Sequence, residues 1–304
     1  MLDSIKPKGR VIFLYLLAPV LIYMFTVFVP LVAALYFSFF EWKGGPHMKF
    51  NGVANYVELL KDGTFWQAFG HNAYLIVACI IGQIGIAFVF VLIINSRLVK
   101  LKNIHRVFVF FPSTIAAVSI GFIWTMIYDQ RRGILNHIIA NVTHKSIKDL
   151  PIWLNNPKTV MLLVAIPLIW QYIGYYMVIL FSAISSVDPE IFEVAELDGA
   201  TAIQRAIHIT FPLIRDTLLV CVTLCIAGNM KAFDSIYTLT SGGPGNASNV
   251  MALYGYNVSF KQSNMGYGSA ISIGIFVLSL GVILISQLLT AKKSEKKERI
   301  EDEI

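Results

Sequence analysis

The stretch 189-PEIFEVAELDGATAIQRAIHITFP-212 lies between two long apolar runs, yet it has the composition of a small soluble helical hairpin. Four acidic residues stand in its first half: Glu190, Glu193, Glu196 and Asp198. The presence of such a polar segment between two apolar runs calls for a structural or functional explanation. We call this segment, residues 189–212, the acidic hairpin.

Local signals predict two short helices in the acidic hairpin. Asp188 followed by Pro189 indicates a helix start. Aspartate caps the free backbone N–H groups of the first turn, and proline is tolerated there because an N–H at that position has no helical partner. Gly199 predicts the end of that helix, since glycine adopts the left-handed cap without steric cost. Thr201 and Gln204 fit a capping box that begins a second helix.

Both predicted helices carry an apolar side that needs a cover, because helices this short are not stable alone in water. These sides consist of Ile191, Val194 and Ala195 in the first helix and Ile203, Ala206 and Ile207 in the second. The membrane surface or the chain's own spans are one possible cover, and a separate protein is the other. The protein suits an acidic segment better, because anionic membranes favour basic residues.

The composition of the whole chain is that of an integral membrane protein. Its 304 residues are 56% hydrophobic and only 14% charged, with a mean hydropathy of +0.68. Soluble domains carry about a quarter charged residues. Basic residues flanking the spans account for the net charge of +6, so we expect no nucleic-acid partner. The three cysteines lie in apolar runs and are interpreted as packing residues.

We expect one all-α polytopic domain over residues 1–304, with six spans of about 20 or more residues each. The spans lie at about residues 12–39, 72–95, 107–128, 160–185, 213–238 and 267–290, with a cytoplasmic loop at 186–212. The span at 213–238 has a charge-free core of only Thr217–Met230. We still predict a span here, because a total of five spans would place the two basic termini on opposite sides of the membrane.

Lysine and arginine residues set the expected orientation, because they favour the cytoplasmic side. Six spans place three basic clusters on that side: Lys6, Lys8 and Arg10; Arg97, Lys100, Lys102 and Arg106; and Lys292, Lys293, Lys296, Lys297 and Arg299. The N- and C-termini and the acidic hairpin are then cytoplasmic, and segments 41–70, 129–158 and 239–266 face outward. Segment 129–158 carries five basic residues, which weakens the expected difference in basic content between the cytoplasmic and outward segments.

The run Glu193-Val-Ala195-Glu-Leu-Asp198-Gly199-Ala, then Ile209-Thr-Phe-Pro212, resembles the cytoplasmic EAA loop of permease subunits in binding-protein-dependent ABC importers. Val194 and Phe211 depart from the family pattern, but both are apolar. The resemblance implies a coupling helix that docks in a cleft of a separate ATPase subunit. It assigns that role to Glu193, Ala195, Asp198, Gly199, Ile209 and Pro212.

Two further segments resemble the carbohydrate branch of these permeases, the maltose and glycerol-phosphate type. They are Phe50-Asn-Gly-Val-Ala-Asn55-Tyr56 and the run from Phe233-Asp234 to Leu239-Thr-Ser-Gly-Gly-Pro244. The resemblance implies a sugar, as a mono- or oligosaccharide, or a related polyol phosphate as substrate.

Two charged residues in the fifth expected span are candidates for the substrate pathway. Lys231 and Asp234 are three residues apart, which places them on one face of a continuous helix. Each charge would cost about 2.5–3.5 kcal/mol at the bilayer centre, so they lie near the outer end, in a water-filled cavity, or paired. One interpretation is an ion pair that anchors the helix end; the other is that Asp234 accepts hydrogen bonds from substrate hydroxyls.

The fourth expected span offers Trp170, Gln171 and Tyr172 near its midpoint. Aromatic faces can stack on sugar rings while an amide binds hydroxyls, a mixture typical of ligand pockets. Packing against another subunit explains these residues equally well. Gln83 in the second span is predicted to form an interhelical hydrogen bond.

The sequence contains neither a phosphate-binding Gly-x-x-x-x-Gly-Lys-Ser/Thr loop nor a His-Glu-x-x-His zinc motif. We therefore expect a non-enzymatic chain with no cofactor or metal of its own, and ATP hydrolysis on a partner. The expected partners are a second homologous permease, two ATPase subunits, an extracytoplasmic solute-binding protein and membrane lipid.

The leading hypothesis is a permease subunit in the cytoplasmic membrane of a bacterium or archaeon. One alternative is a secondary transporter driven by an ion gradient, although no convincing internal repeat of that class is present. The other is a membrane scaffold without a transport pathway. Transport by the chain alone would support the first alternative, and substrate-stimulated ATPase activity of a complex would argue against the second.

Overall fold

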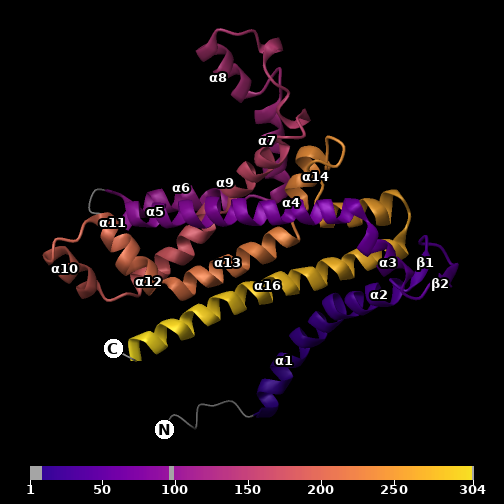
Figure 1. Ribbon diagram of the computed structural model, residues 1–304, viewed down its shortest axis with the longest axis horizontal. Coiled ribbons are helices and arrows are strands. Elements are labelled where there is room, and N and C mark those ends of the chain that lie inside the picture. The colour runs from indigo at the N-terminus through magenta and orange to yellow at the C-terminus, as the bar shows by residue number, and fades with distance from the viewer. Residues whose placement is uncertain (1–8, 96–98, 303–304) are drawn as a thin grey trace. The chain divides into compact units, whose positions relative to one another are not determined.

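The computed structural model describes residues 9–95 and 99–302, and nearly all of them are helical (Figure 1). Lys6, Lys8 and Arg97, which contribute to the predicted orientation, lie outside the described residues. The chain forms two compact units. The first combines the N-terminal part up to Asp62 with Gly255–Phe276, and the second combines Gly63–Tyr254 with the part that begins at Val277.

The first unit contains apolar helices and a β-hairpin. Its elements are α1 (Gly9–Tyr23), the π-helical turn η2 (Met24–Phe28), α2 (Val29–Phe37), β1 (Phe40–Trp42), β2 (Met48–Phe50), α3 (Ala54–Lys61), the π-helical turn η8 (Asn257–Lys261) and the first part of α16 (Met265–Asp302). The two strands are antiparallel, with Phe40 opposite Phe50. No residue in the strongly apolar part of the helical run Phe13–Phe37 is buried, as expected for a helix that faces lipid or another protein.

The predicted motif at residues 50–56 joins α2 to the β-hairpin. Asn55 Nδ2 donates to the carbonyl oxygens of Ser38 (2.8 Å) and Phe40 (3.0 Å). The hydroxyls of Tyr56 and Ser38 are hydrogen-bonded at 2.6 Å. Buried Asn55 therefore links the carbonyl of Ser38, the residue after the end of α2, with the carbonyl of Phe40 in β1.

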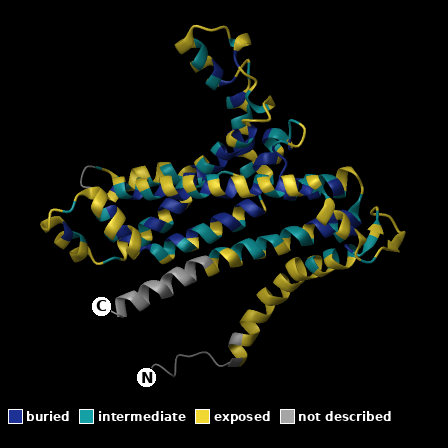
Figure 2. Cartoon of the chain, viewed as in Figure 1, coloured by how far each residue is buried: buried dark blue, intermediate teal, exposed yellow. Residues whose placement is uncertain are grey.

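The second unit is a helical bundle in which α9 (Val160–Ser185) contacts α4, α5, α6, α7, α13 and α14. Figure 2 shows buried residues along α4, α9 and α13. Its other elements are α4 (Gly63–Cys79), η3 (Ile80–Gly85), α5 (Ile86–Asn95), α6 (Lys102–Phe110), η4 (Phe111–Thr114), α7 (Ala117–Tyr128), α8 (Ile134–Thr143), η5 (Ile147–Asp149), η6 (Trp153–Asn155), α10 (Pro189–Leu197), α11 (Ala202–Arg205), η7 (Ala206–Thr210), α12 (Phe211–Leu213), α13 (Arg215–Met230), α14 (Asp234–Thr240), the beginning of α15 (Met251–Tyr256) and the remainder of α16.

Glycine lets α6 approach α9 closely. A Cβ atom at Gly174 would overlap the Val109 carbonyl oxygen and the Phe110 backbone. Only a residue without a side chain permits this contact, which is typical of helix packing in membranes.

Among the described residues, four helices are long and apolar enough to cross a membrane: Phe13–Phe37, Gly63–Asn95, Val160–Ser185 and Met265–Leu288. Two further pairs would qualify if each is one span: Lys102–Thr114 with Ala117–Tyr128, and Ala202–Leu213 with Arg215–Met230. The pairs are bent by 97° and 75°. The fold is therefore the predicted all-α membrane class, and the number of six spans stays a prediction.

The third and fifth expected spans differ from the straight helices that their hydropathy predicts. Pro112 lies in the 3₁₀ turn at the first bend, and Ile115 and Ala116 that follow have non-helical backbone angles. In the fifth span, α13 ends at Met230 and α14 starts anew at Asp234. The prediction that Lys231 and Asp234 share one helix face is wrong, because the helix is interrupted between them.

Candidate functional site

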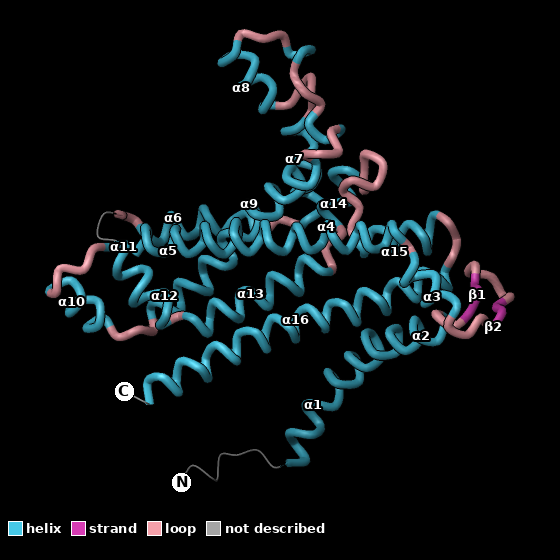
Figure 3. The backbone as a smooth tube through the Cα atoms, viewed as in Figure 1, coloured by secondary structure: helices cyan, strands magenta, loops and turns pink. Residues whose placement is uncertain are grey.

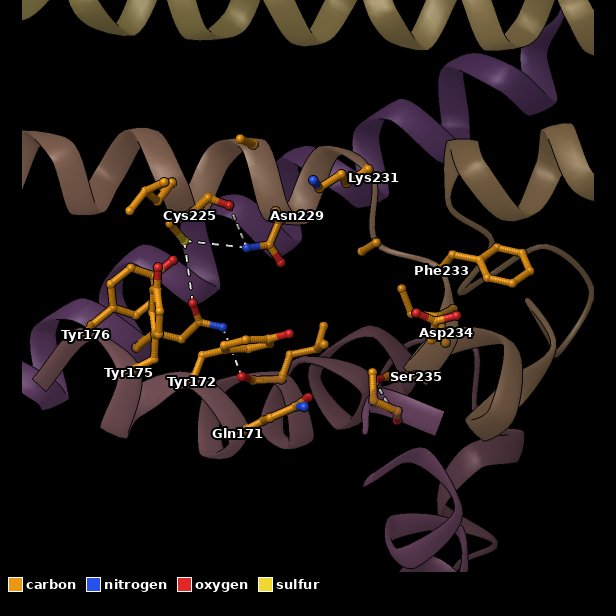
Figure 4. Close-up of a pocket in the computed structure, with 18 residues that line it drawn as sticks. Gln171, Tyr172, Tyr175, Tyr176, Cys225, Asn229, Lys231, Phe233, Asp234 and Ser235 are labelled. Atoms are coloured by element: carbon orange, nitrogen blue, oxygen red, sulfur yellow. Dashed lines mark hydrogen bonds between the residues drawn. The ribbon is translucent and has the colours of Figure 1, made fainter. Parts of the chain in front are cut away.

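A cavity of about 490 Å³ lies in the second unit, where α13 ends and α14 begins, opposite the middle of α9 (Figure 4). The interruption of the helix at residues 231–233 contributes part of its wall. Its polar and aromatic lining residues are Gln83, Gln171, Tyr172, Tyr175, Tyr176, Asn229, Lys231, Phe233, Asp234 and Ser235.

Four of the five predicted pathway residues line this cavity: Gln171, Tyr172, Lys231 and Asp234. Trp170 does not. Consecutive residues of a helix point about 100° apart, and the Trp170 ring packs edge-on against Trp124 at 6.0 Å between centroids. Trp170 therefore does not share this cavity with Gln171 and Tyr172, and its place in the substrate pathway stays a prediction.

Asp234 occupies the first turn of α14, where the helix dipole favours a carboxylate. Ser235 Oγ donates to the Ala117 carbonyl (3.2 Å), and a Cβ atom at Gly121 would overlap Thr238, so α14 is packed tightly on α7. Lys231 and Asp234 form no ion pair with each other in the described part of the chain, and the interpretation as a helix-end ion pair is wrong. Figure 4 shows the Tyr172 ring pointing toward Asp234 across the cavity.

Gln171 is 1% exposed and supports the bend before α7. Its Nε2 donates to the Ile115 carbonyl (3.0 Å), which the non-helical backbone at the bend leaves free. Its Oε1 has no hydrogen-bond partner among the described residues. The amide thus retains one acceptor that a ligand or water could use.

The predicted interhelical hydrogen bond of Gln83 is confirmed, since its Nε2 donates to the Leu168 carbonyl of α9 at 2.9 Å. Its Oε1 lies 3.6 Å from Cys225 Sγ. The three cysteines are free and buried, which agrees with their interpretation as packing residues.

Asn72, which was not among the predicted site residues, is completely buried and joins three elements. Its Nδ2 donates to the Asn229 carbonyl at 2.7 Å and lies 3.4 Å from the Met230 carbonyl at the end of α13. Its Oδ1 accepts from the Met251 N–H (3.0 Å) at the start of α15. Asn72 therefore fixes the end of α13 beside the cavity. An asparagine at the start of the second expected span was the available signal.

The run after α14 forms a closed turn. Ser248 Oγ lies 2.8 Å from Thr240 Oγ1 and 2.6 Å from the Gly243 carbonyl oxygen. The Gly242 N–H donates to Thr240 Oγ1 (3.2 Å). These bonds give Thr240 of the motif at residues 239–244 a structural role, because its hydroxyl closes the turn.

The structure confirms both predicted helix starts in the acidic hairpin. The Asp188 side chain accepts from the Glu190 N–H (3.0 Å), and Thr201 and Gln204 form the capping box. Gly199 has φ +76°, and the Ala200 N–H donates to the Ala195 carbonyl (3.0 Å), which ends α10. Figure 3 shows α10 between two loop segments.

The two halves of the acidic hairpin are joined by an ion pair between Arg205 and Glu196, with 3.3 Å between Nη1 and Oε2. Of the predicted coupling residues, Ala195 is buried, Ile209 is half-buried, and Glu193, Asp198, Gly199 and Pro212 are exposed. The exposed residues are accessible to a partner.

Much of the hairpin's apolar surface remains uncovered by this chain. Val194 is 57% exposed, Leu197 87% and Ile203 72%. Ala206 of the predicted apolar side is buried, whereas Ile207 is exposed. The chain's own helices therefore cover only part of the face that the sequence predicts to need a cover.

The chain matches the family described as "Binding-protein-dependent transport system inner membrane component" over residues 92–294. It is 31% identical over 280 residues to the probable ABC transporter permease protein YurN of Bacillus subtilis (strain 168), covering 91% of this chain and 95% of that protein. It is 29% identical to the probable starch degradation products transport system permease protein AmyD of Thermoanaerobacterium thermosulfurigenes, covering 94% and 96%.

The fold is similar to that in the crystal structure of a bacterial ABC transporter involved in the import of the acidic polysaccharide alginate. The TM-score is 0.81 at 19% sequence identity, covering 94% of this chain and 96% of that chain. A second structure of the bacterial alginate ABC transporter, in complex with alginate pentasaccharide-bound periplasmic protein, gives a TM-score of 0.80 at 19% identity, covering 94% and 95%.

Proposed function

The chain belongs to the family of binding-protein-dependent transport system inner membrane components, and from this we propose that it is the permease subunit through which an ATP-driven importer moves a carbohydrate. Relatives named for starch degradation products and multiple sugars support this substrate class. A related polyol phosphate is the second substrate to test. Family membership argues against the two alternatives, an ion-driven carrier and a scaffold.

The observation that carries the proposal is the cavity between α9, α13 and α14. Its volume of about 490 Å³ falls within the range of about 300–1,000 Å³ for small-molecule sites. Tyrosine rings provide faces for a sugar ring, and Asp234, Lys231 and Gln171 provide acceptors and donors for hydroxyls. We assign the substrate contact to Tyr172 and Asp234, with Lys231 and Gln171 beside them.

The acidic hairpin is the proposed docking site for the ATPase subunit. Its exposed apolar residues need a cover, and its caps and ion pair hold the two helices in one shape. We assign the coupling role to the exposed Glu193, Asp198, Gly199 and Pro212, and to the half-buried Ile209 and the buried Ala195 beneath that surface. A partner would close on ATP and move the hairpin, while this chain binds no nucleotide itself.

The complete importer would contain a second permease, two ATPase subunits and an extracytoplasmic solute-binding protein. The periplasmic protein in the related alginate complex supports the last of these. We propose that the chain lies in the cytoplasmic membrane of a bacterium or archaeon, with both termini and the hairpin in the cytoplasm. Segments 41–70, 129–158 and 239–266 then face outward.

Transport by a reconstituted complex tests this function. With the binding protein and ATP present, a sugar that the binding protein carries should enter vesicles and stimulate ATP hydrolysis. Tyr172→Ala should lower uptake at least tenfold, whereas Trp170→Ala, a neighbour outside the cavity, should have a much smaller effect. Equal effects of both variants would contradict the assigned site, and uptake without ATP would contradict the importer.

A further inference from the structure

Residues 129–158 between α7 and α9 form a small folded lobe, which we call the α8 lobe. Asn136 is completely buried at its centre. Its Nδ2 donates to the Gln130 carbonyl (3.0 Å), and its Oδ1 accepts from Trp153 Nε1 (2.7 Å). Gln130 Nε2 donates to the Leu150 carbonyl (2.8 Å). These hydrogen bonds join α8 to the segments before and after it, so they hold the surface of the lobe in a fixed position.

Aromatic residues gather where the lobe joins the membrane helices. Tyr128 and Leu163 form a buried cluster against which Trp124 and Trp153 pack. Tryptophan and tyrosine concentrate at membrane–water boundaries, because their rings are amphipathic. The apolar helices end at Tyr128 and begin again at Val160, which indicates that the base of the lobe lies at such a boundary, at the end of α9 opposite the acidic hairpin.

A tight turn keeps α8 close to the end of α7. Asp129 Oδ1 accepts from the backbone N–H groups of Arg131 (2.9 Å) and Arg132 (2.7 Å). The Gly133 N–H donates to the Asp129 carbonyl (3.0 Å), and α8 begins at the next residue. The start of α8 therefore lies within a few residues of the membrane boundary.

One face of α8 exposes aliphatic side chains at a spacing of four residues. Ile134 is 60% exposed, Ile138 54% and Val142 76%. Leu135 packs inward against the buried cluster at the lobe's base. The apolar arc of this helix thus continues from the lobe's interior onto its surface.

The lobe is also basic. It contains five lysine and arginine residues and two aspartates. Arg131 and Arg132 precede α8, and Lys145 and Lys148 follow it, all four exposed. Cationic groups at both ends of an exposed apolar stripe favour an anionic surface with an apolar interior.

We propose that α8 lies on the membrane surface at the N-terminal end of α9, with Ile134, Ile138 and Val142 among the acyl chains and the basic residues bound to anionic phospholipid headgroups. The position of the lobe beside the membrane boundary favours lipid over a protein partner. The inference depends on membrane embedding of the chain and not on its substrate.

Depth-dependent quenching tests the position of α8. The full chain carrying Ile138→Cys, labelled with an environment-sensitive fluorophore, is placed in nanodiscs of phosphatidylcholine alone or mixed with phosphatidylglycerol. The native cysteines are buried, so labelling favours the new thiol. A nitroxide lipid should quench position 138 strongly in the anionic discs. The matched control Asn155→Cys, exposed in the same lobe, should be quenched weakly.

Charge removal tests the role of the headgroups. Arg131→Gln with Arg132→Gln keeps the turn, because their backbone N–H groups make the bonds to Asp129. Each basic residue near an anionic surface contributes about fivefold in binding (about 1 kcal/mol), so the advantage of phosphatidylglycerol should largely disappear. Equal quenching at 138 and 155, or protection of position 138 only after the binding protein is added, would overturn the proposal.

Discussion

Replacing Asn72 with leucine should destabilise the second unit more than its size change implies. Asn72 makes two short buried hydrogen bonds, to the Asn229 carbonyl (2.7 Å) and from the Met251 N–H (3.0 Å). Leucine leaves the Met251 N–H buried without a hydrogen bond, which costs about 1–3 kcal/mol, whereas the Asn229 carbonyl still accepts from the Ala232 N–H at 3.3 Å. The expected loss is therefore about 1–3 kcal/mol in the free energy of unfolding.

Unfolding of the purified protein in mixed micelles, followed by circular dichroism as denaturing detergent is added, measures this loss. Asn155→Leu is the matched control, because Asn155 is exposed and surface substitutions usually change stability by less than about 0.5 kcal/mol. Asn72→Leu should also reduce transport, since the end of α13 forms a wall of the cavity. If Asn72→Leu is as stable as the control, the hydrogen-bonded role of Asn72 is refuted.

Three further substitutions test the bundle and the acidic hairpin. Gly174→Val should cost at least about 1–3 kcal/mol, measured in the same unfolding assay, because the new side chain would overlap the Val109 carbonyl. Leu197→Ser should leave the chain's stability unchanged but weaken ATPase co-purification roughly tenfold or more, since burying a leucine contributes about 1.5–3 kcal/mol; unchanged affinity would exclude Leu197 from the interface. Gly199→Pro cannot adopt φ +76° and should abolish ATPase docking, so normal transport by this variant would contradict the coupling role.

Short-range signals predicted the acidic hairpin well. Asp188, Gly199 and the Thr201–Gln204 capping box act through backbone groups within a few residues, and the structure reproduces each of them. Hydropathy likewise predicts the membrane class, because it depends only on composition along the chain.

The cavity was predictable only in part. Gln171 and Tyr172 could be singled out as polar or aromatic residues in an apolar helix, but hydropathy carries no information on which way each one points. Hydropathy therefore does not separate Trp170 from these two neighbours. The interruption after Met230 was hidden because the surrounding residues are compatible with a helix, and Asn72 reveals its importance only once three distant elements are placed together.

The acidic hairpin is rigid at the surface on which the proposed ATPase partner would act. Caps begin both of its helices, a glycine turn fixes their angle, and the Arg205–Glu196 pair ties them together. The backbone should then flex mainly at the adjacent 75° bend between Leu213 and Arg215. A displacement of the acidic hairpin would therefore move it as a rigid body. At the bend this movement would tilt α13, whose far end borders the cavity.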